Sequence, residues 1–136
     1  MIKKKIICID YGIKYSGLSI TNGINNIAFG LCNIQTNKLL NYLKKKIIKN
    51  NISIIIIGLP KKLNNKNQIT TINVYKLKNN LYNLFPNIKI NLIDERFTTK
   101  LSKYYLNKMN IKKKNIKEKI NIMSSILILQ SYLNNK

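Results

Sequence analysis

The sequence predicts an α/β domain built on a mixed β-sheet with helices on both faces. Three apolar runs, at residues 2–10, 52–57 and 88–93, have the length and composition of strands buried on both sides. Stretches with helical periodicity separate these runs. Strands joined by right-handed helical crossovers lie parallel in one sheet, so the three runs are expected to be parallel neighbours.

An antiparallel meander is predicted to complete the sheet. After a glycine-bearing turn at 11–15, residues 16–21 are expected to form a second strand and residues 26–34 a third. Asn22-Gly23 is a hairpin signal between them, since both central positions of such a turn require positive φ. The three-strand meander and the two later strands make a five-stranded sheet.

Four helices are predicted from capping residues and apolar spacing. Thr36 is a typical N-cap, and Pro86-Asn87 is expected to end the second helix. The polar residues 61–68 are expected to form a loop. The helices are predicted at 36–50, 69–84, 98–109 and 115–134. Their core residues are predicted to be Leu39, Leu40, Leu43 and Ile47, then Val74, Leu77, Leu81 and Leu84, and in the last helix Ile116, Ile120, Met123 and Leu127.

The charge balance indicates a polyanionic partner. The chain has 25 Lys+Arg against four Asp+Glu, a net charge of +21, and its 45% hydrophobic content still supports one packed domain over residues 1–136. Lysines that neutralise phosphates release condensed counterions, so nucleic acid is the favoured partner. A membrane surface is less favoured, because no long basic amphipathic helix with bulky apolar anchors is evident. Part of the excess is also expected from compositional drift towards Lys, Asn and Ile.

Residue types exclude several chemistries. The chain contains no histidine, and its two cysteines, Cys8 and Cys32, are far apart. A zinc site, a Cys-His pair and a Ser-His-Asp triad are therefore not expected. Both cysteines are interpreted as reduced residues of a cytoplasmic protein. The apolar run after Lys3-Lys4-Lys5 is too short for a signal peptide, and Asp10 interrupts it.

Two of the four acidic residues stand where parallel strands are expected to end. Asp10 closes the first apolar run and Glu95 follows the last. Ligands gather at the carboxyl ends of parallel strands, so the two carboxylates are expected to meet there and hold Mg²⁺ or Mn²⁺. Such a site can hydrolyse phosphodiesters without histidine. Asp94 should face the other way, because strand residues alternate; the alternative is that 94–96 is a solvated turn with local ion pairs.

Basic residues around this edge are candidates for phosphate contacts. Gly12 lets the backbone approach a phosphate closely, or simply permits a tight turn. Each lysine cluster could equally be a solvated face. The predicted nucleic-acid-binding residues are Lys14, Lys61, Lys62, Arg96 and Lys113.

Four segments together resemble the YqgF/RuvX family, in order and over nearly the whole chain. They are Asp10-Tyr11-Gly12-Ile13-Lys14, Gly58-Leu59-Pro60, Asp94-Glu95-Arg96-Phe97-Thr98-Thr99 and Ile126-Leu127-Ile128-Leu129-Gln130-Ser131-Tyr132-Leu133. The resemblance implies an RNase H-like fold. It also implies a bacterial cytoplasmic nuclease of ribosome biogenesis that matures the 5′ end of the small-subunit rRNA precursor, or a resolvase of Holliday junctions.

The resemblance places three metal-binding catalytic positions on this chain. Its first two carboxylates fall on Asp10 and Glu95, and its third, an Asp, falls on Asn121. An amide oxygen can ligate a metal, but one negative charge is lost. Glu118 is three residues before Asn121 and shares its helix face, so we hypothesise that it supplies the missing ligand. The alternative is that Glu118 is a surface residue. Tyr15 also departs from the family, which often has Arg there.

Three functions remain open from the sequence. The first is metal-dependent cleavage of precursor rRNA, and the second is the same chemistry on branched DNA. The third is a catalytically weakened protein that binds ribosomal precursors, a hypothesis motivated by Asn121. A monomer or weak homodimer is expected; a dimer would favour a symmetric DNA junction and a monomer the rRNA role.

Overall fold

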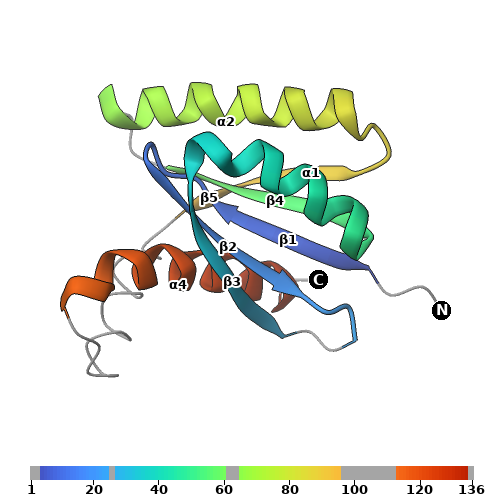
Figure 1. The fold of residues 1–136 in the computed structure, drawn as a ribbon, viewed down its shortest axis with the longest axis horizontal. Helices are drawn as coiled ribbons and strands as arrows, with labels where there is room; N and C mark the ends of the chain where they lie inside the picture. The colour runs from blue at the N-terminus through green and yellow to red at the C-terminus, as the bar shows by residue number, and fades with distance from the viewer. Residues whose placement is uncertain (1–3, 25–26, 61–64, 96–112, 135–136) are drawn as a thin grey trace.

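The computed structural model describes residues 4–24, 27–60, 65–95 and 113–134, with side chains at all of these except 65, 66, 95 and 113–117. Its centre is one five-stranded sheet in the order β3-β2-β1-β4-β5 (Figure 1). The strands are β1 (Lys5–Asp10), β2 (Tyr15–Thr21), β3 (Ala28–Gln35), β4 (Ile52–Pro60) and β5 (Lys89–Glu95). β1, β2 and β3 pair antiparallel, and β4 pairs parallel with β1 and β5. The predicted mixed sheet is confirmed.

Helices cover both faces of the sheet. α1 (Leu39–Asn50) and α2 (Asn65–Leu84) lie together on one face, and α4 (Lys113–Asn134) lies on the other (Figure 1). Alternate strand residues separate two cores, because successive side chains point to opposite faces. Ile7, Ile9, Ile55 and Ile57 pack in the core under α1 and α2, while Ile6, Cys8, Ile54 and Ile56 pack in the core with α4. The helix predicted at 98–109 lies outside the described residues.

The beginnings of two helices differ from prediction. Thr36 does not cap α1; it starts a short 3₁₀ turn, η1 (Thr36–Lys38), and no side chain caps either element. Its hydroxyl donates instead to the carbonyl oxygen of Gly12. α2 begins at Asn65, so the end of the predicted 61–68 loop is helical. Leu84, predicted to be core, is 46% exposed at the end of α2.

The buried face of α4 also differs from prediction. Its fully buried positions are Ser124, Ser125, Ile128, Leu129 and Leu133, whereas Ile120, Met123 and Leu127 are only half-buried. The predicted stripe, whose first residue Ile116 has no described side chain, is therefore not the most deeply buried part of the helix. Apolar periodicity overlooks the serines, which bury at low cost because their hydroxyls find partners.

A pair of serines ties α4 to the middle of the sheet. Ser125 Oγ donates to the carbonyl oxygen of Cys8 at 2.9 Å, and it lies 2.8 Å from Ser19 Oγ. The Ser125 proton is used on β1, so Ser19 donates to Ser125. Both serines are fully buried, and the helix is thereby held to β1 and β2 at once.

The β2–β3 connection is longer than predicted, because β3 begins two residues later than the expected position 26. Thr21 pairs with Ala28, so residues 22–27 connect the strands. Gly23 has φ 78°, but Asn22 does not have positive φ. Instead, Asn22 Oδ1 accepts a hydrogen bond from the Ile24 N–H at 2.9 Å. The Asn-Gly pair therefore makes a side-chain-closed turn inside a wider loop.

A glycine on β2 allows α4 to approach the sheet closely. A Cβ at Gly17 would overlap the carbonyl group of Asn121 and crowd the Ile122 nitrogen. These are backbone atoms of α4, which cannot turn aside as a side chain can. By contrast, a Cβ at Gly30 would meet side-chain atoms of Ile122 and Ile126.

We expect Gly17→Ala to lower the free energy of unfolding by about 1–3 kcal/mol, because α4 must shift as a unit. Urea denaturation measures this change. Gly30→Ala is the matched control on β3 and should cost less, since the isoleucines can adjust. Equal losses in the two variants would contradict the close seating of α4 on Gly17.

Candidate active site

The candidate site is a row of residues crossing the sheet where β1 ends. Asp10 is the last residue of β1, and its register partners are Gly17 on β2 and Gly58 on β4. Beyond these glycines, Asn33 pairs with Gly17 and Ile93 pairs with Gly58. Asp10 therefore has a glycine as its register partner on each side, and neither register partner carries a side chain.

Asp10 belongs to the sheet face covered by α4. It alternates with Ile6 and Cys8, both of which pack in the α4 core. The apolar residues of β1 are buried up to Ile9, and Asp10, which follows them, is half-buried. A half-buried carboxylate at the end of a strand can take a ligand from outside the sheet.

Helix α4 brings Asn121 to the same row. Its backbone carbonyl lies over Gly17, the register partner of Asp10. Its side-chain Nδ2 donates to Oδ1 of Asn33 at 3.2 Å. Asn33 is on β3, and β2 separates β3 from β1. The amide nitrogen of Asn121 is thus tied to the β3 side of the row, and its Oδ1 is the atom with which it could ligate a metal.

Glu95 stands at the same edge of the sheet on the other side of Asp10. Its strand position pairs with Pro60, two positions beyond the Gly58–Ile93 pair. Standard strand spacing and rise place the Cα atoms of Asp10 and Glu95 about 12 Å apart. An Asp and a Glu side chain with bound dications can span that separation. Asp94 is exposed, and its register partner is Leu59. The Leu59 side chain packs on the core under α1 and α2, so Asp94 is on the sheet face opposite α4.

Glu118 lies on α4 beyond the row. Asn121 lies over Gly17, and Ser125 lies beside Ser19. The distance along the helix from 121 to 125 is about 6 Å, close to the distance of about 7 Å along the strand from 17 to 19. α4 therefore runs alongside β2, and Glu118 lies one turn nearer the beginning of β2. It is exposed. Its proposed role as a metal ligand stays a prediction.

The other predicted contact residues are placed unequally. Lys14 is exposed on the β1–β2 turn. Arg96, Lys61 and Lys62 lie outside the described residues, and Lys113 begins α4 without a described side chain. Their nucleic-acid contacts stay predictions.

A closed chain of hydrogen bonds fixes the turn after Asp10. The Gly12 N–H donates to Ser16 Oγ at 3.3 Å, and Thr36 Oγ1 donates to the Gly12 carbonyl at 2.7 Å. Ser16 and Thr36 hydroxyls are 2.9 Å apart, and the Thr36 proton is already used, so Ser16 donates to Thr36. The Thr36 N–H also donates to the Lys14 carbonyl at 2.9 Å.

The conformation of this turn explains Gly12. A Cβ at position 12 would overlap the Tyr15 carbonyl oxygen, so the tight turn itself requires glycine. The sequence left open whether Gly12 serves a phosphate contact or a tight turn. It did not indicate that the Ser16 and Thr36 hydroxyls stabilise this turn, because such hydrogen bonds leave no periodic pattern. Burial raises the pKa of the neighbouring Tyr11 phenol above its usual 10, so at neutral pH it is protonated and is not a general base.

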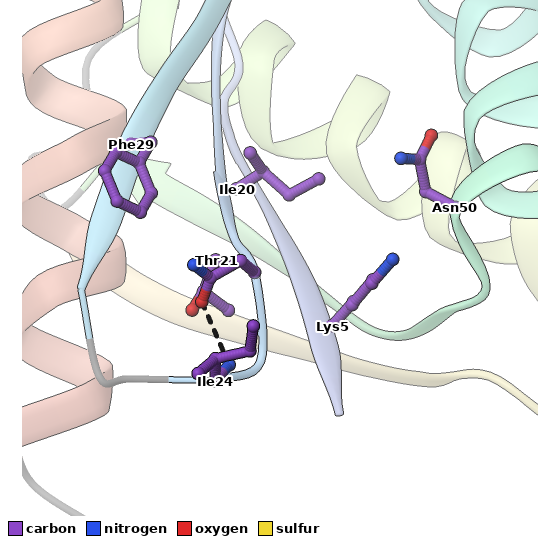
Figure 2. A pocket seen from close by; sticks show the side chains of 7 residues that line it. Lys5, Ile20, Thr21, Ile24, Phe29 and Asn50 are labelled. Atoms are coloured by element: carbon purple, nitrogen blue, oxygen red, sulfur yellow. Dashed lines mark hydrogen bonds between the residues drawn. The ribbon is translucent and has the colours of Figure 1, made fainter. Parts of the chain in front are cut away.

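Cavities lined by described residues lie at both ends of the strands. One, of about 300 Å³, is lined by Lys14, Tyr15, Gln35 and Asn37 beside the Asp10 row. The other, of about 420 Å³, lies where β1 begins; Figure 2 shows it between the β2–β3 loop and the end of α1. The larger cavity is mostly apolar, and the described residues that line it include no carboxylate; they are Lys5, Ile20, Thr21, Asn22, Ile24, Phe29 and Asn50. It is not a candidate catalytic site.

The donor set suits a hard cation with oxygen ligands. Asp10 and Asn121 offer a carboxylate and an amide oxygen, and Glu95 stands at the same edge. Mg²⁺ and Mn²⁺ prefer such ligands. Over the described residues, no three His, Cys, Asp or Glu side chains gather at one point. Within the same part of the chain, no helix combines the length and apolar character needed to cross a bilayer.

The order of the strands and the helices on both faces of the sheet define an RNase H-like fold, which is also the fold of resolvases. The T. thermophilus RuvC structure in complex with a Holliday junction substrate matches with a TM-score of 0.57 at 9% identity, over 97% of this chain and 94% of that chain. The Fowlpox virus resolvase bound to Holliday junction DNA matches with a TM-score of 0.56 at 16% identity, over 96% and 99%. At these identities the similarity establishes the fold alone.

Sequence comparison specifies the family. The model of the family described as "RuvX: Holliday junction resolvase" matches residues 4–135, and the chain belongs to that family. A protein of Karelsulcia muelleri named "Putative pre-16S rRNA nuclease" is 38% identical, over 95% of this chain and 97% of that protein. A protein of the same name from Bacteroides thetaiotaomicron is 34% identical over 97% of each. The predicted YqgF/RuvX membership is confirmed.

We expect Thr36→Val to lower the free energy of unfolding by about 1–3 kcal/mol, because it leaves the Ser16 hydroxyl and the Gly12 carbonyl without a shared partner. Thr71→Val is the control: its hydroxyl donates to the Asn67 carbonyl within α2, and its loss should cost less than about 0.5 kcal/mol. Urea unfolding of both variants tests this. No difference between them would mean that the hydrogen-bond chain does not stabilise the turn.

Proposed function

We propose that this protein is a Mg²⁺- or Mn²⁺-dependent endonuclease that processes the 5′ end of the 16S rRNA precursor in the cytoplasm. The observation that carries the proposal is the half-buried Asp10 at a strand end between two glycines, with Glu95 at the same sheet edge. Membership of the RuvX family and the names of its relatives support the substrate class. The net charge of +21 supports a nucleic acid in general.

In this proposal the residues have distinct roles. Asp10 and Glu95 would hold the metal, and Asn121, Glu118 or both would complete the ligands. When bound, the metal would activate water and stabilise the leaving oxygen. Lys14 on its fixed turn and Arg96 would hold phosphates beside the reacting one, and Lys61, Lys62 and Lys113 would bind other phosphates of the nucleic acid. The protein would act as a monomer or a weak homodimer.

We expect Asp10→Asn to reduce cleavage of a precursor 16S rRNA fragment in Mn²⁺ by at least about a hundredfold, because an amide replaces a charged ligand. Cleavage is measured by gel electrophoresis of end-labelled RNA. Lys5→Gln, at the opposite end of β1, is the control and should retain activity. Undiminished cleavage by Asp10→Asn would overturn the assignment of the site.

We expect Asn121→Asp to tighten Mn²⁺ binding by about tenfold or more, because it restores a negative charge to the ligand set. The Asn33 amide can turn to donate to the new carboxylate, so the fold should tolerate the change. Calorimetric titration with Mn²⁺ measures the effect. Glu118→Gln provides the comparison: weaker Mn²⁺ binding would support Glu118 as a ligand, and an unchanged affinity would remove it from the site.

A catalytically weakened binding protein is the second candidate. The observation that favours it is the hydrogen bond that ties Asn121 to Asn33, on the far side of β2 from Asp10. RNA binding without turnover by the unmutated chain would select this candidate. Faster cleavage of a four-way DNA junction than of precursor RNA would instead select the resolvase function.

A further inference from the structure

The smaller cavity lies directly beside the candidate active site. Tyr15 and Gln35 are register partners on β2 and β3, two positions along from the Gly17–Asn33 pair. Standard strand geometry makes this step about 7 Å. The Tyr15–Gln35 pair is therefore the next row of the same sheet face after the row that contains Asp10.

The two rows share the face covered by α4. Gly17 faces α4, since a Cβ there would overlap Asn121, and Asn33 faces α4 because it bonds the Asn121 side chain. Strand side chains repeat every second residue, so Tyr15 and Gln35 are on that face too. The irregularity in the β2–β3 register falls between Leu18 and Ser19 and does not disturb this alternation.

The lining of this cavity has the chemistry of a nucleotide site. Tyr15 is 45% exposed, so much of its ring is accessible. Gln35 and Asn37 supply exposed amides, and Lys14 supplies an exposed cation. An aromatic ring can stack on any of the bases. Side-chain amides can form hydrogen bonds with base edges, and a lysine can bind the phosphate of the same nucleotide. None of the described residues that line the cavity is acidic.

The cavity is also held rigid. Its lining residues flank the segment closed by the hydrogen bonds among Gly12, Ser16 and Thr36. The Thr36 N–H bond to the Lys14 carbonyl joins the two walls directly. A preformed site loses less conformational entropy on binding than a loop that must first be ordered.

We propose that Lys14, Tyr15, Gln35 and Asn37 form a stacking subsite for one unpaired nucleotide next to the phosphate that is cleaved. The inference rests on the proposed nuclease function, because it takes Asp10 as the neighbouring reaction centre. It adds a substrate feature: a base in a duplex hides both faces against its neighbours, so only an unpaired or flipped base can stack on Tyr15. The enzyme therefore prefers a single-stranded segment at the cleavage site.

The test measures RNA binding separately from cleavage. Asp10→Asn protein is titrated against a fluorescein-labelled single-stranded RNA of twelve nucleotides and against the matching RNA duplex, and anisotropy gives both affinities. Adding Tyr15→Ala is expected to weaken single-strand binding about 5- to 100-fold, the range for loss of one base stack, and to change duplex binding less than twofold. Tyr15→Phe, which keeps the ring, should bind as the parent does.

Control variants separate stacking from general effects. Tyr82 on α2 is 59% exposed and lies on the opposite sheet face, so Tyr82→Ala should leave both affinities unchanged. Thermal unfolding by circular dichroism confirms that each variant is folded. Gln35→Ala is the second probe of the cavity and should also weaken single-strand binding.

Two results would overturn the subsite. One is single-strand affinity within twofold of the parent in both Tyr15→Ala and Gln35→Ala. The other is equal weakening for single strand and duplex, which would indicate a phosphate contact only. Failure of the nuclease function is distinguishable, because it appears as absent cleavage by the unmutated chain in Mn²⁺ while the Tyr15 effect on binding persists.

Discussion

The seating of α4 on β2 is the constraint on which the site depends. Gly17 removes the side chain that would hold the helix away, and Ser125 replaces apolar packing with a buried hydrogen bond to the Cys8 carbonyl. These two contacts fix both the height and the direction of α4 over the strands. Asn121 reaches the row that contains Asp10 only because α4 lies close to the sheet at Gly17. A larger residue at position 17 would therefore displace a candidate catalytic residue as well as destabilise the fold.

Scarce negative charge gives the site its electrostatic character. The chain has four acidic residues, and one of them, Asp10, stands at a strand end with a glycine as its register partner on each side. A strongly basic protein attracts phosphates over its whole surface, which raises the rate of encounter but does not position a scissile bond. Carboxylates that bind dications at one edge of the sheet can position the scissile bond. General attraction and local placement are thus separate properties of this chain.

The sequence predicted the parts of the fold that depend on continuous apolar runs. Ile6 to Ile9 and Ile54 to Ile57 bury on both faces, so the parallel strands and the edge holding Asp10 followed from burial and crossover geometry. The predicted stripe on α4 does not coincide with the fully buried positions, because Ser125 buries through hydrogen bonds to β1 and β2 that apolar spacing cannot indicate. Thr36 failed as a cap for the same reason, since its hydroxyl serves Gly12, 24 residues away. Asn33 gave no local signal, and only the folded β3 brings it to Asn121.

One turn connects the candidate catalytic residue to the candidate substrate contacts. Asp10 precedes this turn and Tyr15 follows it, while Gly12 is bonded from both sides by Ser16 and Thr36. Asp10 and Tyr15 lie on adjacent rows of one sheet face, so neither can move along the strands without breaking ladder pairs to β2 or β3. In the proposed enzyme, the pleat of the sheet would therefore set the spacing between a metal-bound phosphate and a stacked base. A pair of residues on a loop would allow that spacing to vary, whereas this arrangement would link the position of cleavage to the position of the unpaired nucleotide.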